Sequence, residues 1–429
     1  RMDRFPCDGW LHLTVSSTSD EISVSMKHAE DHVAYTELAL PEKWKAYIRE
    51  NARRQTPGQI WGYLLAEEDA EEDDLPYGPN AVYYYWHIVS REEWRLADDP
   101  LASARKFVEE RGEKHHIVLL DVEAAPGTQT LAFYVTDFVE MWAKHTQELA
   151  MDSTWNTNGG NFELFAAVAD ANGAGVPLAF LFIQTTKDAA PGAKQAILER
   201  FLGHLKALGV DPEFTLTDKD WSEINAMAAT WPDAKQQLCF WHGVRAVKQR
   251  LCKNKDTPAF YDSVAANREF PFIDIDFVPA AQRIRDLTRS LTRMTAAARS
   301  MQSNFCPAPH RLPIIRIHSK HGCQHPLLPE RHGESRSSED IYRDAVHEMY
   351  LHCKANNLAE VWAYLWNLWY RRPHWKLWAR SANSRSIPRK RTTMIVEALW
   401  RNLKRLVLYM YNCPPIDLAL YAVVTKALP

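Results

Sequence analysis

Residues 162–183 read FELFAAVADANGAGVPLAFLFI, and the fold follows from this stretch. Two apolar runs, 162–169 and 176–183, are separated by six residues that include Asn172 and two glycines. Apolar runs of this length on either side of a loop with Gly and Asn are typical of a β-hairpin. The sequence therefore predicts two buried antiparallel strands here.

The patterns on both sides extend this hairpin into a larger sheet. Short apolar runs predict further strands at 116–121, 130–135, 149–156, 213–218 and 235–242. Helical spacing and caps predict helices at 193–208, 222–229 and 244–252. Three antiparallel strands followed by helix-linked strands indicate a mixed α/β sheet with the strand order of the ribonuclease H-like fold.

The domain organisation is predicted from changes in composition along the chain. We expect a small α+β N-terminal region, a ribonuclease H-like core, and a large helical insertion that interrupts this core. The expected boundaries are a strand-rich module at 1–40, a helical region at 41–115 with an acidic loop at 67–74, the core at 116–252, the insertion at 253–385 and the completion of the core at 386–429. Within the insertion, the Pro- and His-rich residues 306–332 are expected to form a solvated loop.

The charge of the chain is unevenly distributed. Over 429 residues there are 51 basic and 54 acidic side chains, so the net charge is −3. Residues 1–150 hold 15 Lys and Arg against 28 Asp and Glu, whereas the remainder holds 36 against 26. The later part therefore offers a surface for a polyanion, and the first part does not do so by charge alone.

Cellular context is indicated by the cysteines and by the apolar runs. Seven cysteines, an odd number at wide spacing, favour a reducing compartment over a disulfide framework. No apolar run reaches the ~20 residues of a membrane span, so we expect no membrane-spanning helix. The opening Arg1, in place of Met, leads us to expect a piece of a longer protein.

Two aspartates carry the predicted chemistry. Asp152 ends the first strand of the core and Asp218 ends the fourth, and these strands are neighbours in a ribonuclease H-like sheet. Carboxylates that converge at one sheet edge suit a pair of divalent cations for phosphoryl transfer, and oxygen ligands favour Mg²⁺ or Mn²⁺. A strand-end Asp taken alone is more often a turn or cap residue; two at the two expected positions favour the metal site.

Short motifs around these aspartates resemble the catalytic core of the Mutator-like (MULE) transposases. The motifs are DSTWNTN at 152–158, FTLTDKD at 214–220, WPDA at 231–234 and LCFWH at 238–242, the last followed by a basic helix. The resemblance covers roughly residues 145–252, and Trp231 stands where the family pattern has Phe. It implies a DDE-type DNA transposase that uses Mg²⁺ or Mn²⁺, binds terminal inverted repeats and target DNA, acts as a homo-oligomer and works in the nucleus.

The resemblance also implies a third carboxylate in a downstream helix. The stretch TTMIVEALWRNLKR at 392–405 matches the family pattern in its paired Thr, its Glu and its Lys-Arg end, whereas Met394 and Trp400 replace two Asn residues. Glu397 therefore completes a catalytic and metal-binding triad with the two aspartates. Two other acids are candidates for the metal site. Glu360 lies outside the apolar stripe of its predicted helix and is expected to be solvated. Asp220 could bind metal beside Asp218, but it is the weaker candidate of these two aspartates.

Two sets of Cys and His residues leave a zinc site open. Cys7, His28 and His32 resemble the C-terminal half of a WRKY/GCM-like zinc finger, and they are equally consistent with ordinary core or surface histidines. Cys239 and His242 form half a zinc site at best, so zinc ligation, packing and DNA positioning all remain open for this pair. The Cys and His residues of the 306–332 stretch match no standard finger spacing.

A basic, Trp-containing segment is the predicted DNA-binding surface. Residues 371–405 hold 11 Lys and Arg and a single acid, Glu397. Cations neutralise phosphates and aromatic rings stack on bases, so we favour DNA binding over a basic helix hairpin that packs in a core. The candidate DNA-binding residues are Arg371, Arg372, Trp375, Arg389, Lys390, Arg391, Arg401, Lys404 and Arg405.

Three functions are consistent with these residues. The first is metal-dependent DNA cleavage and strand transfer by a transposase. The second is a transposase-derived DNA-binding regulator that keeps the fold without the chemistry, which an intact triad disfavours. The third is another ribonuclease H-like nuclease, which the long insertion before Glu397 and the LCFWH motif disfavour.

Overall fold

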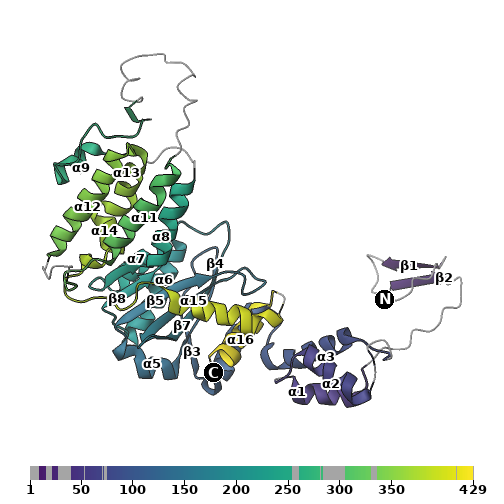
Figure 1. Ribbon diagram of the computed structural model, residues 1–429. Coiled ribbons are helices and arrows are strands. Elements are labelled where there is room, and N and C mark those ends of the chain that lie inside the picture. Colours follow the sequence, from purple (N-terminus) through teal and green to yellow (C-terminus); the bar gives the residue numbers. More distant parts are fainter. Residues whose placement is uncertain are drawn as a thin grey trace. The chain divides into compact units, whose positions relative to one another are not determined.

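The chain divides into two compact units, residues 1–93 and 94–429 (Figure 1). The computed structural model describes residues 9–15, 22–27, 40–52, 54–69, 71, 75–253, 260–280, 282–283, 305–329, 336–411 and 413–428. Within these ranges, no helix is both long enough and apolar enough to span a bilayer.

The first unit holds a hairpin and three helices. Strands β1 (Trp10–Val15) and β2 (Ile22–Lys27) pair in antiparallel register, and α1 (Glu42–Asn51), α2 (Pro57–Glu68) and α3 (Pro79–Trp94) follow. A capping box starts α2, in which the Thr56 hydroxyl accepts from the Gln59 amide and the Gln59 side chain accepts from the Thr56 amide.

Two predictions for the N-terminal region concern this unit: an acidic loop at 67–74 and a zinc finger at 1–40. The first two acids of the expected acidic loop instead form the end of α2, and most of the rest of that loop lies outside the described residues. Cys7, His28 and His32 also lie outside the described residues, so the zinc-finger interpretation stays a prediction.

The second unit is built on a seven-stranded mixed sheet in the order β3-β4-β7-β6-β5-β8-β9. The strands are β3 (Ile117–Leu120), β4 (Thr128–Val135), β5 (Glu148–Thr154), β6 (Glu163–Ala171), β7 (Ala174–Thr185), β8 (Phe214–Thr217) and β9 (Lys235–Leu238). Strands β5 to β7 pair antiparallel, and β5, β8 and β9 pair parallel. This is the predicted ribonuclease H-like order, with β3 and β4 added beyond β7.

Each face of the sheet is covered by helices. One face packs on α6 (Ala193–Ala207) and α7 (Trp221–Thr230), because the apolar sides of these helices share a core with alternate strand residues such as Leu149 and Met151. The opposite face, which includes Ala150 and Leu216, packs on α15 (Met394–Asn402) and α16 (Ile416–Ala422) (Figure 1).

Shorter helical elements complete this part of the unit. α4 (Pro100–Arg111) packs on β3, β4 and α16, so it belongs with the sheet although we expected the core to begin at residue 116. The remaining elements around the sheet are η1 (Glu113–His115), α5 (Thr136–Trp142), η2 (Ala143–His145), η6 (Leu403–Val407), η7 (Leu408–Met410) and η8 (Val423–Ala427).

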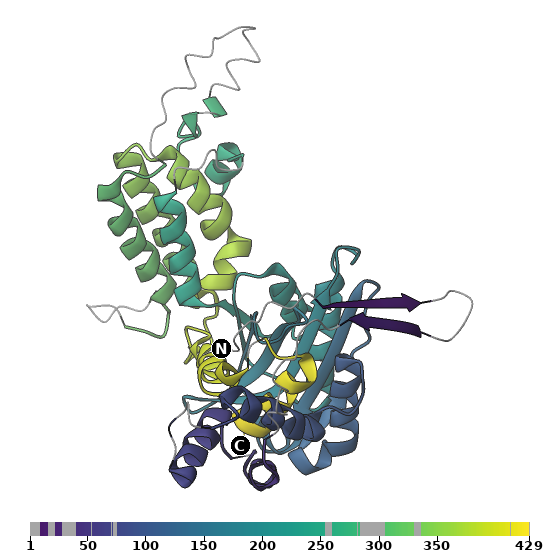
Figure 2. The same ribbon diagram turned by 90° about the vertical axis from the view of Figure 1, so that its right-hand side faces the viewer.

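The helical insertion has its own aromatic core. Its elements are α8 (Phe240–Cys252), α9 (Ser263–Glu269), α11 (Ala308–Cys323), α12 (Ser338–Ala355), α13 (Ala359–Leu365), η4 (Trp366–Tyr370), α14 (Arg372–Trp378) and η5 (Arg380–Ala382). α8, α11, α12 and α13 lie side by side as a helical layer beyond the sheet edge (Figure 2). Fully buried rings such as Trp362, Trp369 and Tyr370 fill this core.

Two predictions in the insertion are wrong. The fifth core strand ends at Leu238, and the residues expected to continue it begin α8 instead, because the amide of Gly243 already bonds the carbonyl of Cys239. The expected solvated loop at 306–332 contains the 16-residue helix α11, which continues through Pro313. Its buried residues Ile314 and His318 pack against the aromatic core, and tertiary packing outweighs the local Pro signal.

The closeness of α15 to the sheet can be tested at Gly175. A Cβ at this position of β7 would lie 3.0 Å from the Ile395 Cβ and 3.0 Å from the Val168 Cγ1. Gly175→Ala should therefore push α15 away and lower the free energy of unfolding by about 1–3 kcal/mol. Gly203→Ala is the matched control, since nothing lies within 4 Å of that added Cβ in α6. Denaturant unfolding should show the control unchanged or more stable by about 0.5–1 kcal/mol; equal stability of both variants would contradict the close contact.

Candidate metal and nucleic-acid site

The strand register places the two aspartates opposite each other. β5 and β8 pair Leu149 with Thr215 and Ala150 with Leu216. Continued by two residues, this register sets Asp152 level with Asp218. Because side chains alternate between faces along a strand, both aspartates project to the face of Ala150 and Leu216, which α15 covers.

Glu397 arrives at the same edge from α15. Val396 and Trp400 of this helix are buried in the core beneath it, and the Glu397 amide bonds the carbonyl of Thr393 at 3.0 Å in the first turn. The preceding segment is tied to the core, because the amide of Phe240 donates to the carbonyl of Arg391 at 2.7 Å. The helix that carries Glu397 therefore starts beside the helix that follows β9.

His242 lies between two of the three acids. Its Nδ1 is 3.4 Å from the Asp218 Oδ1 and its Nε2 is 3.6 Å from the Glu397 Oε1. These are ion-pair distances, slightly long for hydrogen bonds. The carboxylates of Asp218 and Glu397, which lie 179 residues apart in the chain, thus meet across one imidazole ring, and the sequence interpretation assigned no such contact to the histidine.

Charge crowding at this site changes the protonation of its members. Burial, with a smaller contribution from the nearby charges of Asp218 and Glu397, raises the pKa of Asp152 to about 7, while the Ser153 amide and the His242 charge oppose the shift. A hydrogen bond from the His242 ring to the Cys239 sulfur, together with the charges of Asp218 and Glu397, raises the pKa of His242 to about 9, so this ring is an imidazolium at neutral pH. The site is therefore a cluster of negative charge with one internal cation.

Two overlapping sets of side chains at this site offer metal-ligand atoms, and among the described residues the set with all of these atoms within 4.8 Å of one another is Cys239, His242 and Glu397. Asp152, Asp218 and Glu397 offer carboxylate oxygens, which are the ligands that Mg²⁺ and Mn²⁺ prefer. Cys239, His242 and Glu397 bring a sulfur, a nitrogen and an oxygen within 4.8 Å of one another, a donor set that suits Zn²⁺. Both sets include Glu397, so the two kinds of ion would compete for this carboxylate.

Asp220 has another role. Its side chain accepts from the Ser222 amide at 2.7 Å as the cap of α7, and its second oxygen bonds Lys194 at 2.9 Å. Lys194 also bonds Glu163, whose carboxylate accepts from the Ser153 hydroxyl at 2.6 Å. Asp220 is thus used in a capping and ion-pair network beside the site.

Glu223 is an acid at this site that the sequence interpretation did not assign. It is 2% exposed in the first turn of α7, and its Oε2 has no hydrogen-bond partner among the described residues. Burial and the charges of Asp152 and Asp220 raise its pKa well above the usual value, so its carboxyl is neutral. In the sequence, an acid at this position is indistinguishable from one that only offsets a helix dipole.

The predicted DNA-binding residues divide into exposed and engaged groups. The exposed ones are Arg371, Arg389, Arg391, Arg401 and Arg405. Two further cations form ion pairs: Lys390 lies 3.1 Å from Asp170, and Arg372, although exposed, pairs with Glu269 and Glu339. The side chain of Lys404 is half-buried. Trp375 is 3% exposed and packs on Trp378 in the insertion core, so it cannot stack on bases as expected.

The histidines of α11 are core residues. The His318 ring stacks on Trp378 with centroids 4.2 Å apart, and its burial lowers its pKa to about 3. His321 is buried between the Tyr370 hydroxyl at 2.8 Å and Glu348 at 3.0 Å. Neither ring is arranged with cysteines as a zinc site in the described part of the insertion.

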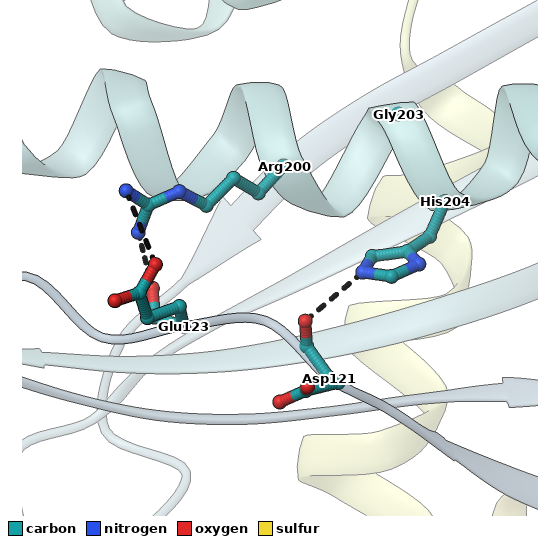
Figure 3. A pocket seen from close by; sticks show the side chains of 5 residues that line it. All are labelled: Asp121, Glu123, Arg200, Gly203 and His204. Atoms are coloured by element: carbon teal, nitrogen blue, oxygen red, sulfur yellow. Dashed lines mark hydrogen bonds and ion pairs between the residues drawn. The ribbon is translucent and has the colours of Figure 1, made fainter.

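A hollow of about 550 Å³ lies at the other end of the sheet and is lined by Asp121, Glu123, Arg200, Gly203 and His204 (Figure 3). The groups in it satisfy one another: Arg200 donates to the Glu123 carbonyl at 2.7 Å, and a ring nitrogen of His204 lies 3.0 Å from the Asp121 carbonyl. β3 is at the opposite sheet edge from β9, so this hollow is separate from the carboxylate site.

The chain is similar in sequence to known proteins, most specifically over residues 148–246. Residues 148–246 match the family described as MULE transposase domain. A sequence relative, Mating-type protein ALPHA3 of Kluyveromyces lactis, is 21% identical over 425 residues, which cover 94% of this chain and 45% of that protein. The chain thus spans about half the length of this relative. The solved Drosophila P element transposase strand transfer complex aligns over 94% of both chains with a TM-score of 0.33 and 9% identity. The residues that match this family, 148–246, include Asp152, Asp218, Cys239 and His242.

Proposed function

We propose that this protein is a Mutator-like DNA transposase that cleaves DNA at terminal inverted repeats and joins the freed end to target DNA. The observation that carries the proposal is the meeting of Asp218 and Glu397 across His242, level with Asp152 in the strand register. Three acids from separate elements at one sheet edge are the arrangement that phosphoryl transfer with divalent ions requires.

The three acids act as ligands. Asp152, Asp218 and Glu397 would hold Mg²⁺ or Mn²⁺, which would supply Lewis acidity for phosphoryl transfer. No side chain has to form a covalent bond with DNA. The imidazolium of His242 offsets the charge of Asp218 and Glu397 when no ion is bound, so the acids stay close together in the free protein.

The expected partners follow from this chemistry. The substrate is DNA, the active complex is a homo-oligomer that holds two element ends, and the working compartment is the nucleus. Zn²⁺ in an N-terminal finger built from Cys7, His28 and His32 remains part of the proposal for sequence-specific binding.

A second function is a DNA-binding regulator that retains the fold without cleavage. A relative that is named as a mating-type protein supports it. The presence of all three acids, and of a histidine that lies within 4 Å of two of them, favours cleavage. The two functions differ in one measurable property, which is metal-dependent strand cleavage.

The triad can be tested by substitutions that keep shape and remove charge. Asp152→Asn, Asp218→Asn and Glu397→Gln should each lower Mn²⁺-dependent cleavage of terminal-repeat DNA by at least about a hundredfold, because each removes a charged ligand. DNA binding in a gel shift should be retained. Glu360→Gln is the matched control, since this rival acid accepts from the Ala280 amide at 3.1 Å, within the insertion. Full cleavage by any triad variant would remove that residue from the site, and an inactive wild type that binds DNA would favour the regulator.

Metal affinity should depend on pH through Asp152. Its pKa of about 7 means that a proton competes with the ion below neutral pH. We expect Mn²⁺ affinity, measured by titration calorimetry, to fall roughly tenfold per pH unit below pH 7 and to level off above it. His242, with a pKa of about 9, keeps its proton over this range and adds no slope.

The same carboxyl affects stability with the opposite sign. Because its folded-state pKa is raised from 3.8 to about 7, the metal-free protein loses stability as the pH rises between these two values, and the loss is complete above about pH 7. In Asp152→Asn this loss should be absent and the Mn²⁺ pH slope should be flat. An affinity independent of pH in the wild type would show that this carboxyl is not a ligand.

The basic surface beside Glu397 can be tested by charge reversal. Arg401 and Arg405 are exposed on α15 and on the π-helical turn that follows it. Changing both to Glu should weaken binding to all DNA sequences about equally, because phosphates carry no base information. The slope of log affinity against log salt should flatten by about 0.9 per lost phosphate contact. Lys106→Glu on α4 is the control; if both proteins bind alike over a salt titration, DNA does not lie along α15.

A further inference from the structure

Tryptophan is generally buried in this protein, and three exceptions lie around the carboxylate site. Of sixteen Trp side chains, eleven are buried and four are largely exposed. Three of these four are Trp155, Trp221 and Trp241, which are 51%, 50% and 48% exposed. Two of them follow the two aspartates of the site by three residues, and the third directly precedes the site histidine.

Each of these rings is attached to a fixed element next to the site. Trp241 lies in the first turn of α8, with its ring centroid 4.8 Å from that of His242 at an interplanar angle of 73°. Trp221 is the first residue of α7, and its ring meets His374 edge-on at 5.9 Å. Trp155 directly follows the last residue of β5. The rings are therefore held at the ends of the same strands and helices that position the acids.

The surroundings of these rings are charged. The guanidinium of Arg245 lies 4.9 Å from the Trp241 ring centroid, and Lys248 is exposed on the same helix. A partner that covers these separate rings must combine flat apolar faces with negative charge, which describes a nucleic-acid strand.

The geometry of duplex DNA restricts this partner. In a duplex the faces of the bases are covered by their neighbours, so an indole can stack on a base only where the helix is opened or the base is turned out. We propose that Trp155, Trp221 and Trp241 are stacking platforms for unpaired bases next to the scissile phosphate. The site then takes DNA that is locally opened at the cleavage point in preference to intact duplex.

This inference rests on the proposed function, because it names the form of DNA that the carboxylate site accepts. The cations bind phosphates of any DNA, whereas the indoles distinguish opened from paired strands. The two contributions can therefore be separated by comparing two DNA forms of one sequence.

The test compares binding to a duplex and to the same duplex with a short mismatched bubble. The full chain is used with Ca²⁺ in place of Mn²⁺, so that binding is measured without cleavage. Fluorescence anisotropy should show tighter binding of the bubble by the wild type. Each Trp→Ala change should weaken bubble binding roughly 5- to 100-fold while duplex binding changes little. The Trp→Phe changes should retain most of the preference, since an aromatic face remains.

A second readout reports stacking directly. 2-Aminopurine placed in the bubble should lose fluorescence on binding wild-type protein, because stacking on an indole quenches it, and should keep it with the Ala variants. Tyr84→Ala is the control, since Tyr84 is an aromatic residue that is 68% exposed on α3, outside the regions proposed to bind DNA. It should match the wild type in both readouts.

The outcomes separate this inference from the proposed function. If the Ala variants bind bubble and duplex as the wild type does, the rings do not stack on bases and the inference is overturned. If they lose both DNA forms equally, or change only the oligomeric state in sedimentation, the rings support the fold or a protein contact, and the inference is again overturned. If the wild type binds neither form, the proposed function itself fails.

Discussion

The place of the third carboxylate depends on one buried acid, Glu148, at the start of β5. Its side chain is 4% exposed and accepts from the backbone amides of Arg389 and Lys390, more than 240 residues further along the chain. Burial raises the pKa of this carboxyl, and the two amides oppose the shift. These bonds hold the returning chain against the first strand of the core, and α15 begins four residues later. The same strand therefore carries Asp152 and fixes the segment that delivers Glu397.

The site is kept negative by the way its neighbouring cations are used. Lys219 follows Asp218 directly, but its ammonium lies 4.6 Å from the centroid of the Trp369 ring, inside the insertion. Lys194 lies between Glu163 and Asp220, beside the site. The positive charge that lies between Asp218 and Glu397 is thus the imidazolium of His242. A single positive charge neutralises two carboxylates less completely than a divalent ion does. A divalent cation therefore binds most favourably at this site, where neighbouring side chains leave part of the negative charge unneutralised.

The sequence predicted the sheet and the aspartates because both depend on short-range periodicity. Alternating apolar residues determine which face of a strand is buried. The position of a residue near the end of a strand determines at which edge of the sheet it lies. The sequence alone therefore indicated where Asp152 and Asp218 lie in the sheet. Composition alone could not show which way a side chain points. Trp375 was assigned to DNA for its basic neighbours, yet it is buried, and α11 was missed because Pro313 outweighed an apolar stripe in the pattern. The role of His242 remained open because its contacts join residues far apart in the sequence.

The insertion is part of the site's construction. α8 begins at the site, where Cys239 bonds the end of β8 through its amide, and its later residues Val247 and Leu251 are buried in the insertion core. A Cβ at Gly243 would lie 3.5 Å from the Trp369 ring, which is ordinary van der Waals contact, so this helix packs directly on the aromatic core. The aromatic core thus fixes the orientation of α8, and α8 fixes His242 between two acids. A change in the packing of the insertion would therefore reach the carboxylates through a single rigid helix, without crossing the sheet.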